Sequence, residues 1–457
     1  MRPQLLKAVN TLALSTDFYE LTMVAGYHAA GLMVPATFEL YVRELPRNRS
    51  FLIAAGLEQV LEYLENLHFD EEDIKHLRSL PGLQGVGPAF FEEYLPRFRF
   101  TGDVWAVDEG TPIFPPEPLL RVTAPLPEAQ LAETALLAHI AFQTSVASRA
   151  ARVVEAASGH PVVEFGARRA HGLEAGVYAA RAAFLAGCES TSNVEAGRRF
   201  GIPVSGTMAH SWVTAFPDEI SAFQQYAGVF GERTVILLDT YDTLAAARAL
   251  AASGLKPGAV RLDSGDVIRL SMNVRAILDA AGLRDTTIFV SGDLDEWRIT
   301  DMLAAGTPVD AFGVGAALST SSDAPSLGAI YKLVEIERAD AAVPIMKLSP
   351  GKQTHPGRKQ VWRLFDDRTA VEDVVELADA QKASRGQPLL KRVMIGGRRE
   401  FAPPSLDGLR TRCRAALAQL PVPVRQLHDP VRYPVRFGDA LQGTIERLSR
   451  TTSSPVA

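Results

Sequence analysis

Polar side chains suited to acid–base and anion-binding chemistry follow short apolar runs in the middle of this chain. His210 comes soon after Gly206-Thr207 at the end of one run, and Asp263-Ser264-Gly265-Asp266 and Ser291-Gly292-Asp293 follow two others. An imidazole can act as a base or a nucleophile, and carboxylates can hold ribose hydroxyls or a hydrated Mg²⁺. The structural alternatives are a buried, satisfied histidine and helix capping by Asp266 or Asp293.

Cationic and glycine-rich segments lie near the same runs. Arg168, Arg169 and Arg261 carry fork-shaped guanidinium groups that suit carboxylates and phosphates. Gly313-Val314-Gly315 follows an apolar run, where glycine lets backbone N–H groups approach a phosphate. The same glycines could equally serve close packing of a strand against a helix, so both interpretations stay open at this point. Phe165 could stack on a flat ring, although aromatic side chains are more often part of a core.

Short strands and helices are expected to alternate between about residues 160 and 315. β-Branched runs alternate there with segments of helical periodicity, which predicts a parallel sheet covered by helices. The rhythm is close to that of an irregular TIM-like (β/α) barrel. The carboxyl ends of parallel strands meet at one face of a barrel, so we expect the polar residues to share a site there. The expected strands are 161–165, 202–204, 234–239, 259–263, 287–291 and 310–315.

A discontinuous, sheet-rich α+β domain is expected to flank the barrel. Residues 36–43 alternate as a half-buried strand does, and prolines break short β-like runs between residues 98 and 122. We expect residues 1–127 to form this domain, residues 128–340 the barrel, and residues 341–457 to complete the N-terminal domain.

The composition argues against several classes of function. Apolar residues make up 47% of the 457 residues, and the net charge of −6 gives no indication of nucleic-acid binding. No apolar run approaches the length of a membrane span, and the N-terminus lacks the sustained apolar core of a signal peptide. Cys188 and Cys413 fit neither a disulfide framework nor a thiolate metal site. We therefore expect a cytoplasmic protein.

Several motifs, in this order along nearly the whole chain, resemble the nicotinate phosphoribosyltransferases. The resemblance implies an enzyme that makes nicotinate mononucleotide and pyrophosphate from nicotinate and phosphoribosyl pyrophosphate. It also implies coupling to ATP hydrolysis, a requirement for Mg²⁺, and a homodimer whose active sites are shared across the interface. The matching segments are TDFYELTM (16–23), FELYVR (38–43), EFGARRAHG (164–172), STSN (190–193), GTMAHSW (206–212), RLDSGD (261–266) and PSLG (325–328).

The resemblance also implies a role for individual residues. His210 and Asp263 are the expected catalytic residues, with His210 transiently phosphorylated to phosphohistidine. Tyr19, from the partner subunit, and Phe165 would sandwich the pyridine ring, and the carboxylates that hold Mg²⁺ are not assigned. The expected substrate contacts are Arg168, Ser192, Thr207, Arg261, Ser264, Gly292, Asp293, Gly313, Gly315 and Thr320.

Ser192 favours nicotinate over nicotinamide as the substrate. The related enzymes that use nicotinamide carry at this position an Asp that accepts the amide N–H₂ group. An Asp would repel the carboxylate of nicotinate, at a cost of about a few kcal/mol in a desolvated site, whereas Ser tolerates it. The alternatives are transfer to nicotinamide or quinolinate, or a non-catalytic barrel that senses a nucleotide. The intact His210 and the Asp263/Asp266 pair argue against the last.

Overall fold

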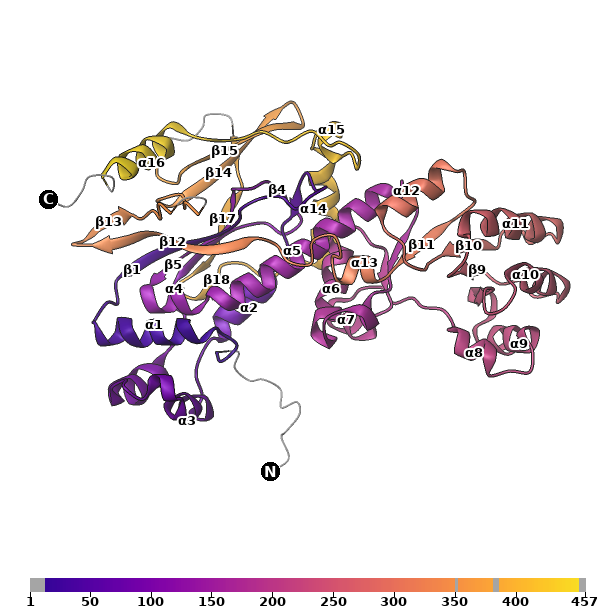
Figure 1. Cartoon of the computed structure of the whole chain (residues 1–457), viewed down its shortest axis with the longest axis horizontal. Helices are drawn as coiled ribbons and strands as arrows, with labels where there is room; N and C mark the ends of the chain where they lie inside the picture. Colours follow the sequence, from indigo (N-terminus) through magenta and orange to yellow (C-terminus); the bar gives the residue numbers. More distant parts are fainter. Residues whose placement is uncertain (1–12, 350–351, 381–385, 452–457) are drawn as a thin grey trace. The chain divides into compact units, whose positions relative to one another are not determined.

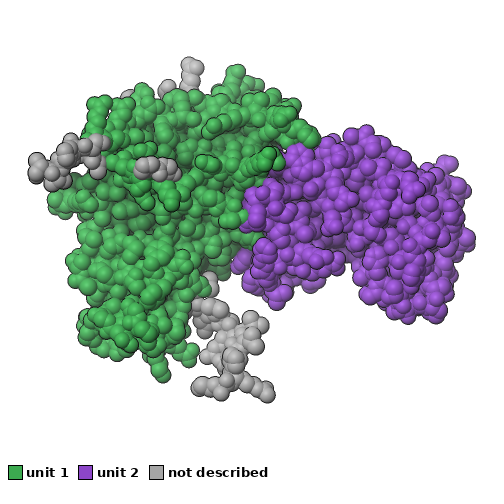
Figure 2. Space-filling model, in the orientation of Figure 1, with its two compact units in different colours: residues 1–144, 326–405, 415–457 green, residues 145–325, 406–414 purple. Residues whose placement is uncertain are grey.

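One six-stranded parallel sheet and one seven-stranded antiparallel sheet are the largest in this chain, whose computed structural model describes residues 13–349, 352–380 and 386–451 (Figure 1). The chain divides into two compact units, which Figure 2 colours separately. Unit 1 comprises residues 1–144, 326–405 and 415–457, and unit 2 comprises residues 145–325 and 406–414.

The boundaries between the units differ from the expected positions after residues 127 and 340. The strand β12 (Ala329–Arg338) pairs with β1 (Pro35–Val42), so the chain beyond residue 325 belongs to a sheet of unit 1. The helix α5 (Glu133–Ala156) continues past residue 144, so the first change of unit falls within a helix. Residues 406–414 join unit 2, where Arg410 forms a 2.7 Å ion pair with Glu189.

Unit 2 contains a six-stranded parallel sheet in the order β7-β6-β11-β10-β9-β8. The first strand along the chain, β6, pairs with the last, β11, as strands do when a barrel closes. The irregular TIM-like barrel expected from the sequence is therefore confirmed. The strands are β6 (Val162–Glu164), β7 (Ser190–Thr191), β8 (Val235–Leu237), β9 (Ala259–Leu262), β10 (Thr287–Val290) and β11 (Ala311–Val314).

The barrel departs from regular strand pairing at residues 202–204, which were expected to form a strand. Only a parallel bridge between Thr191 and Val204 forms there, next to β7. Pro203 has no N–H group to donate to a ladder, which limits pairing at this position. No ladder joins Val204 to β8 within the described part of unit 2, so the ring of strands is interrupted at this point.

Helices follow the strands of unit 2, as the sequence predicts (Figure 1). Asn193, Asp218, Asp242, Asp266 and Asp295 accept backbone N–H groups at the starts of α7, α9, α10, α11 and α12. Asp266 is thus a helix cap, the structural alternative considered for it. The helices are α6 (Leu173–Leu185), α7 (Val194–Phe200), α8 (His210–Thr214), α9 (Glu219–Phe230), α10 (Thr243–Ala252), α11 (Val267–Ala280), α12 (Glu296–Ala304), α13 (Ala316–Ser319) and, shared with unit 1, α14 (Leu406–Ala418).

Alternation along the parallel strands separates an apolar row from a polar one. Because successive side chains of a strand point to opposite faces, every second residue shares a face. One row is completely buried and consists of Ile236, Leu238, Val260, Leu262, Ile288, Val290, Phe312 and Val314. The alternate row ends in the polar residues described below.

Unit 1 contains a seven-stranded antiparallel sheet in the order β13-β12-β1-β5-β3-β17-β18. Strands from both ends of the chain thus share one sheet. The remaining strands of this sheet are β3 (Asp103–Val107), β5 (Pro118–Pro125), β13 (Ala341–Pro344), β17 (Leu390–Ile395) and β18 (Arg398–Arg399). The smaller sheets are formed by β14 (Lys359–Asp366), β15 (Thr369–Leu377), β16 (Gly386–Pro388) and β19 (Val435–Phe437), and by β2 (Leu52–Ile53) and β4 (Pro112–Ile113).

Helices pack with these sheets around a large apolar core. Phe38 of β1 stacks on Tyr331 of β12, with ring centroids 5.0 Å apart. None of the helices in the described ranges is both long and apolar enough to cross a membrane. The helices of unit 1 are α1 (Phe18–Ala29), α2 (Leu57–Asn66), α3 (Glu71–Ser79), α4 (Leu126–Leu131), α15 (Val422–Arg425) and α16 (Asp439–Thr451), with the first half of α5.

Candidate active site

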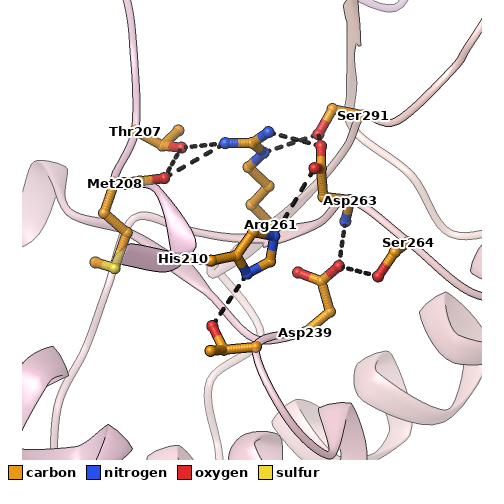
Figure 3. Close-up of polar contacts among 9 residues, drawn as sticks. Thr207, Met208, His210, Asp239, Arg261, Asp263, Ser264 and Ser291 are labelled. Carbon is orange, nitrogen blue, oxygen red and sulfur yellow. Dashed lines mark hydrogen bonds and ion pairs between the residues drawn. The ribbon is translucent and has the colours of Figure 1, made fainter. Parts of the chain in front are cut away.

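Arg261 of β9 connects three polar segments at the carboxyl edge of the parallel sheet (Figure 3). Its Nε donates to Ser291 Oγ at 2.8 Å, and its Nη1 donates to Thr207 Oγ1 at 2.8 Å and to the Met208 carbonyl at 3.4 Å. Its Nη2 pairs with Asp263 Oδ1 at 2.6 Å. A guanidinium has five N–H groups, so these contacts leave one N–H for the oxygen of a substrate. We call Arg261, Thr207, Asp263 and Ser291 the arginine junction.

Strand register explains why residues far apart in sequence meet here. Leu237, Arg261 and Phe289 lie opposite one another in the ladders of β8, β9 and β10. Two residues further along each strand, on the same face, come Asp239, Asp263 and Ser291. The polar strand ends predicted from the sequence are therefore placed side by side by parallel pairing.

Two aspartates at this edge are linked to each other. The Asp263 N–H donates to Asp239 Oδ2 at 3.1 Å, and Ser264 Oγ donates to the same oxygen at 2.6 Å. Burial raises the pKa of Asp263, but the hydrogen bond from Ser291 and the charge of Arg261 outweigh it, so the pKa lies below its usual value. Asp263 is thus held as a carboxylate.

His210 begins α8 and faces this edge (Figure 3). Its Nδ1 shares a 3.2 Å hydrogen bond with Thr240 Oγ1, and its Nε2 lies 3.9 Å from Asp263 Oδ2. The side chain is 43% exposed, so His210 is not the buried, satisfied histidine of the structural alternative. One ring nitrogen is anchored, and the other faces a carboxylate at a surface that ligands can reach.

Phe165, just after β6, forms an aromatic wall beside the junction. Its ring centroid lies 5.6 Å from the Arg261 guanidinium carbon and 5.5 Å from the Phe289 ring. A Cβ on Gly313 would lie 2.7 Å from the Phe289 ring and 3.0 Å from the Phe165 ring. The missing side chain of Gly313 therefore leaves room for two aromatic rings from neighbouring strands, which differs from the strand–helix packing considered from the sequence.

Gly292 has no room for a side chain, because its backbone lies against the backbone of Asp263. Its φ is +91°, and a Cβ there would lie 1.8 Å from the Asp263 carbonyl oxygen. Asp293 also has a positive φ, of 48°, whereas Asp295 caps the next helix. The turn after β10 is thus folded tightly onto the backbone of the junction.

The other predicted site residues come from the ends of other strands of unit 2 or from unit 1. Arg168 and Ser192 follow β6 and β7, and Gly315 precedes α13, where the Thr320 hydroxyl donates to the Ala316 carbonyl at 2.7 Å. Tyr19 belongs to α1 of unit 1 and is 45% exposed. The structure therefore brings together His210, Asp263, Ser264, Thr207, Arg261 and Phe165.

Sequence reasoning counted Ser291 among the polar strand ends but assigned no individual contact to Asp239, Thr240 or Ser291. Each ends or follows a predicted strand, which was the available signal. Their contacts depend on strand register and on the path of the chain before α8.

The donor atoms of the two aspartates suit Mg²⁺. Across residues 13–349, 352–380 and 386–451, no three His, Cys, Asp or Glu side chains are grouped as ligands of one metal ion. Mg²⁺ needs fewer, because it is usually bound by one or two carboxylates together with water and substrate phosphates. Oδ1 of Asp239 is buried without a hydrogen-bond partner. This oxygen and Oδ2 of Asp263 fit a Mg²⁺ ion carried by a phosphorylated substrate.

Domain families match consecutive parts of the chain. The nicotinate phosphoribosyltransferase N-terminal domain matches residues 14–141, and its C-terminal domain matches residues 382–444. The quinolinate phosphoribosyl transferase C-terminal domain matches residues 146–324, which form most of unit 2.

Relatives and solved structures cover most of the chain. A nicotinate phosphoribosyltransferase of Mycobacterium tuberculosis is 46% identical over 95% of this chain and 94% of its own length. The human nicotinate phosphoribosyltransferase is 32% identical over 95% of this chain and 96% of its own.

The crystal structure of human nicotinic acid phosphoribosyltransferase covers 95% of this chain and 99% of its own, at 30% identity and a TM-score of 0.84. That of a nicotinate-nucleotide pyrophosphorylase from Pyrococcus furiosus covers 92% of this chain and 98% of its own, at 27% identity and a TM-score of 0.73. On the strength of these full-length matches, the chain belongs to the nicotinate phosphoribosyltransferase family.

Proposed function

We propose that this chain transfers the phosphoribosyl group of phosphoribosyl pyrophosphate to nicotinate, giving nicotinate mononucleotide and pyrophosphate. The relatives that match the whole chain carry the name of this activity. The observation that carries the proposal is the arginine junction, with Phe165 beside it and the Nε2 of His210 facing Asp263.

The reaction needs a flat pocket for the ring and cations for the leaving group. The pyridine nitrogen bonds to ribose C1 while the bond from C1 to the pyrophosphate oxygen breaks, and its electron pair leaves with pyrophosphate. We assign Phe165 to the pyridine ring, and Thr207 and Arg261 to nicotinate contacts. Arg168 is exposed after β6, where a guanidinium can stabilise the growing negative charge.

We assign Mg²⁺ to Asp239 Oδ1, which has no hydrogen-bond partner, and to Asp263 Oδ2, which faces His210. When bound, the ion neutralises charge on the phosphates of the substrate. The hydroxyl of Ser264 and the backbone N–H of Asp263 orient the Asp239 carboxylate, as partners of a metal ligand commonly do.

We propose that ATP phosphorylates His210. The γ-phosphoryl group would move to Nε2 with release of ADP, because Nδ1 is anchored by Thr240. Water would later release phosphate from the imidazole. This cycle couples ATP hydrolysis to transfer.

We propose a homodimer in which Tyr19 of one subunit covers the pyridine ring held by Phe165 of the other. The adjacent aromatic residues Phe18 and Tyr19 of α1 support this assignment, because both are 45% exposed and exposed apolar patches can mark protein interfaces. Cys188 and Cys413 are free and buried, in keeping with a reducing cytoplasm.

Comparing three pyridine substrates tests the proposed activity. Purified enzyme is given phosphoribosyl pyrophosphate with nicotinate, nicotinamide or quinolinate, and the mononucleotide product is identified by mass. We expect turnover of nicotinate alone, since Ser192 presents no negative charge to the ring's carboxylate. Equal turnover of nicotinamide would refute that role for Ser192, and turnover of quinolinate alone would favour the function named by the domain family of unit 2.

His210→Ala tests the phosphohistidine. We expect this variant to lose ATP hydrolysis and the stimulation of transfer by ATP, while some ATP-independent transfer remains. Stimulation equal to that of the wild type would contradict the assignment.

A further inference from the structure

Glu164 is an unusual residue for its position at the end of β6. Its neighbours in register are Val314 of β11 and Thr191 of β7. Val314 belongs to the buried row of the sheet, which is otherwise apolar from β8 to β11. Glu164 and Thr191 continue that row with polar groups, although they are only 1% and 0% exposed. A buried carboxylate is costly unless its partners satisfy it.

Both carboxylate oxygens of Glu164 have defined partners. Oε1 accepts the Gly166 N–H at 2.5 Å, and Oε2 accepts the Thr191 hydroxyl at 2.6 Å. The Thr191 hydroxyl oxygen in turn accepts the Asn193 N–H at 3.0 Å. Burial raises the pKa of Glu164 above its usual value, although both hydrogen bonds favour the charged form. The carboxylate thus ties the turn after β6 to the turn after β7.

The residues between these contacts belong to the candidate active site. Phe165 lies between Glu164 and Gly166, and Ser192 lies between Thr191 and Asn193. The two backbone segments are also joined directly, because the Ser192 N–H donates to the Glu164 carbonyl at 2.9 Å. By strand alternation Phe165 and Ser192 point to the face opposite Glu164 and Thr191. Glu164 therefore sits behind two site residues without sharing their face.

Gly166 adds a third connection. A Cβ there would lie 2.4 Å from Ser319 Cβ and 2.7 Å from Glu164 Oε1. Ser319 ends α13, so the turn held by Glu164 also packs against the segment after β11. A shift of the Glu164 carboxylate would therefore displace the turn after β7 and the turn that packs against α13, which lie on either side of Phe165.

We propose that Glu164 is a positioning residue that fixes the spacing between Phe165 and Ser192, and so sets the preference for a carboxylate over an amide on the pyridine ring. The inference rests on the proposed function, because it gives the ring to Phe165 and the ring's substituent to Ser192. A displacement of about 1 Å at such contacts can lower a rate by about a hundredfold.

Thr191→Val is the test variant, because it removes one hydroxyl and keeps the shape of the side chain. We expect kcat/KM for nicotinate to fall about tenfold, mostly through KM, and the ratio of nicotinate to nicotinamide turnover to fall similarly. Thr191→Ser restores the hydroxyl and should restore both values. Glu164→Gln keeps the shape but replaces one acceptor oxygen by a donor, so it should shift the ratio in the same direction.

Thr286→Val is the matched control. Thr286 is also buried, and its hydroxyl donates to the Pro257 carbonyl at 2.9 Å just before the amino end of β10, whereas Thr191 ends β7. This variant should lose similar thermal stability and keep the substrate ratio of the wild type. An unchanged ratio in Thr191→Val, or an equal change in Thr286→Val, would overturn the proposal.

Binding measurements separate this inference from the proposed function. Calorimetry gives the dissociation constants of nicotinate and nicotinamide for the wild type and each variant, with no turnover needed. A wild type that prefers nicotinate in binding but transfers nothing refutes the function alone, and loss of the preference in Thr191→Val still supports Glu164. A wild type that binds the two rings equally overturns the role of Glu164.

Discussion

Gly292→Ala places a methyl group where the arginine junction leaves no space. The Cβ would lie 1.8 Å from the Asp263 carbonyl oxygen, although real Cβ contacts are essentially never shorter than 3.0 Å. The two backbones must therefore separate by about 1.2 Å, with Ser291 on one side and Asp263 on the other. Both of these residues hold Arg261, so the displacement is transmitted to the junction.

Two effects of this substitution can be estimated separately. Alanine at a φ of +91° costs roughly 1–2 kcal/mol, because its Cβ crowds the backbone in the left-handed region. The displacement at the junction adds a second effect, since about 1 Å of misplacement can cost about a hundredfold in rate. We therefore expect a modest loss of stability and a loss of about a hundredfold in kcat/KM.

Gly306→Ala supplies the matched control. Gly306 has a φ of +67°, and nothing lies within 4 Å of the place for its Cβ. Both variants are assayed for pyrophosphate release from nicotinate and phosphoribosyl pyrophosphate, and their melting temperatures are compared. Gly306→Ala should lose stability and keep its activity. Equal activity in the two variants would refute the claim that the turn after β10 holds the junction in place.

Three further substitutions test other contacts of the site. Gly313→Ala should raise KM for nicotinate, because its Cβ meets the Phe289 and Phe165 rings. Gly315→Ala is the control and should leave KM unchanged, because the nearest atom to its Cβ would be 3.4 Å away. Equal KM values in the two variants would contradict the packing role of Gly313. Asp263→Asn should destabilise the chain at pH 7. The lowered pKa of Asp263 stabilises the fold above the unfolded value of about 3.9 and ceases to do so as pH falls through the lower folded value. The difference in melting temperature between Asp263→Asn and the wild type should therefore shrink below about pH 4, and a constant difference would argue against an ionised Asp263. Ser192→Asp should lower kcat/KM for nicotinate by about a hundredfold through like-charge repulsion, and unchanged kinetics would remove Ser192 from the substrate contacts.

Local patterns were sufficient to predict the parallel unit. β-Branched runs alternating with helical periodicity indicated five of the six strands almost to the residue, and the polar groups at their ends indicated the face of the site. Arg261 could be selected as one of three arginines near the predicted strands, and Asp263 as a carboxylate at the end of one.

Long-range pairing decided what the sequence left open. The hydrogen bonds of Arg261 to Ser291 and Thr207 depend on ladder register and on the chain's path before α8. The role of Gly313 depends on two rings from separate strands. Likewise, β12 belongs to unit 1 because it pairs with β1, about 290 residues earlier in the chain. No local sequence pattern encodes that pairing.

Replacing Arg261 by Lys tests the central claim, that the arginine junction is where nicotinate receives the phosphoribosyl group. Lysine keeps the positive charge but cannot reach Thr207, Ser291 and Asp263 together. Arg275→Lys is the control, since Arg275 also donates to three residues, Asp279, Leu283 and Thr286, away from the site. The measurement is pyrophosphate release from nicotinate and phosphoribosyl pyrophosphate. We predict equimolar nicotinate mononucleotide and pyrophosphate from the wild type and from Arg275→Lys, and about a hundredfold less from Arg261→Lys. A wild type that releases no pyrophosphate, or an Arg261→Lys variant as active as Arg275→Lys, would contradict the account.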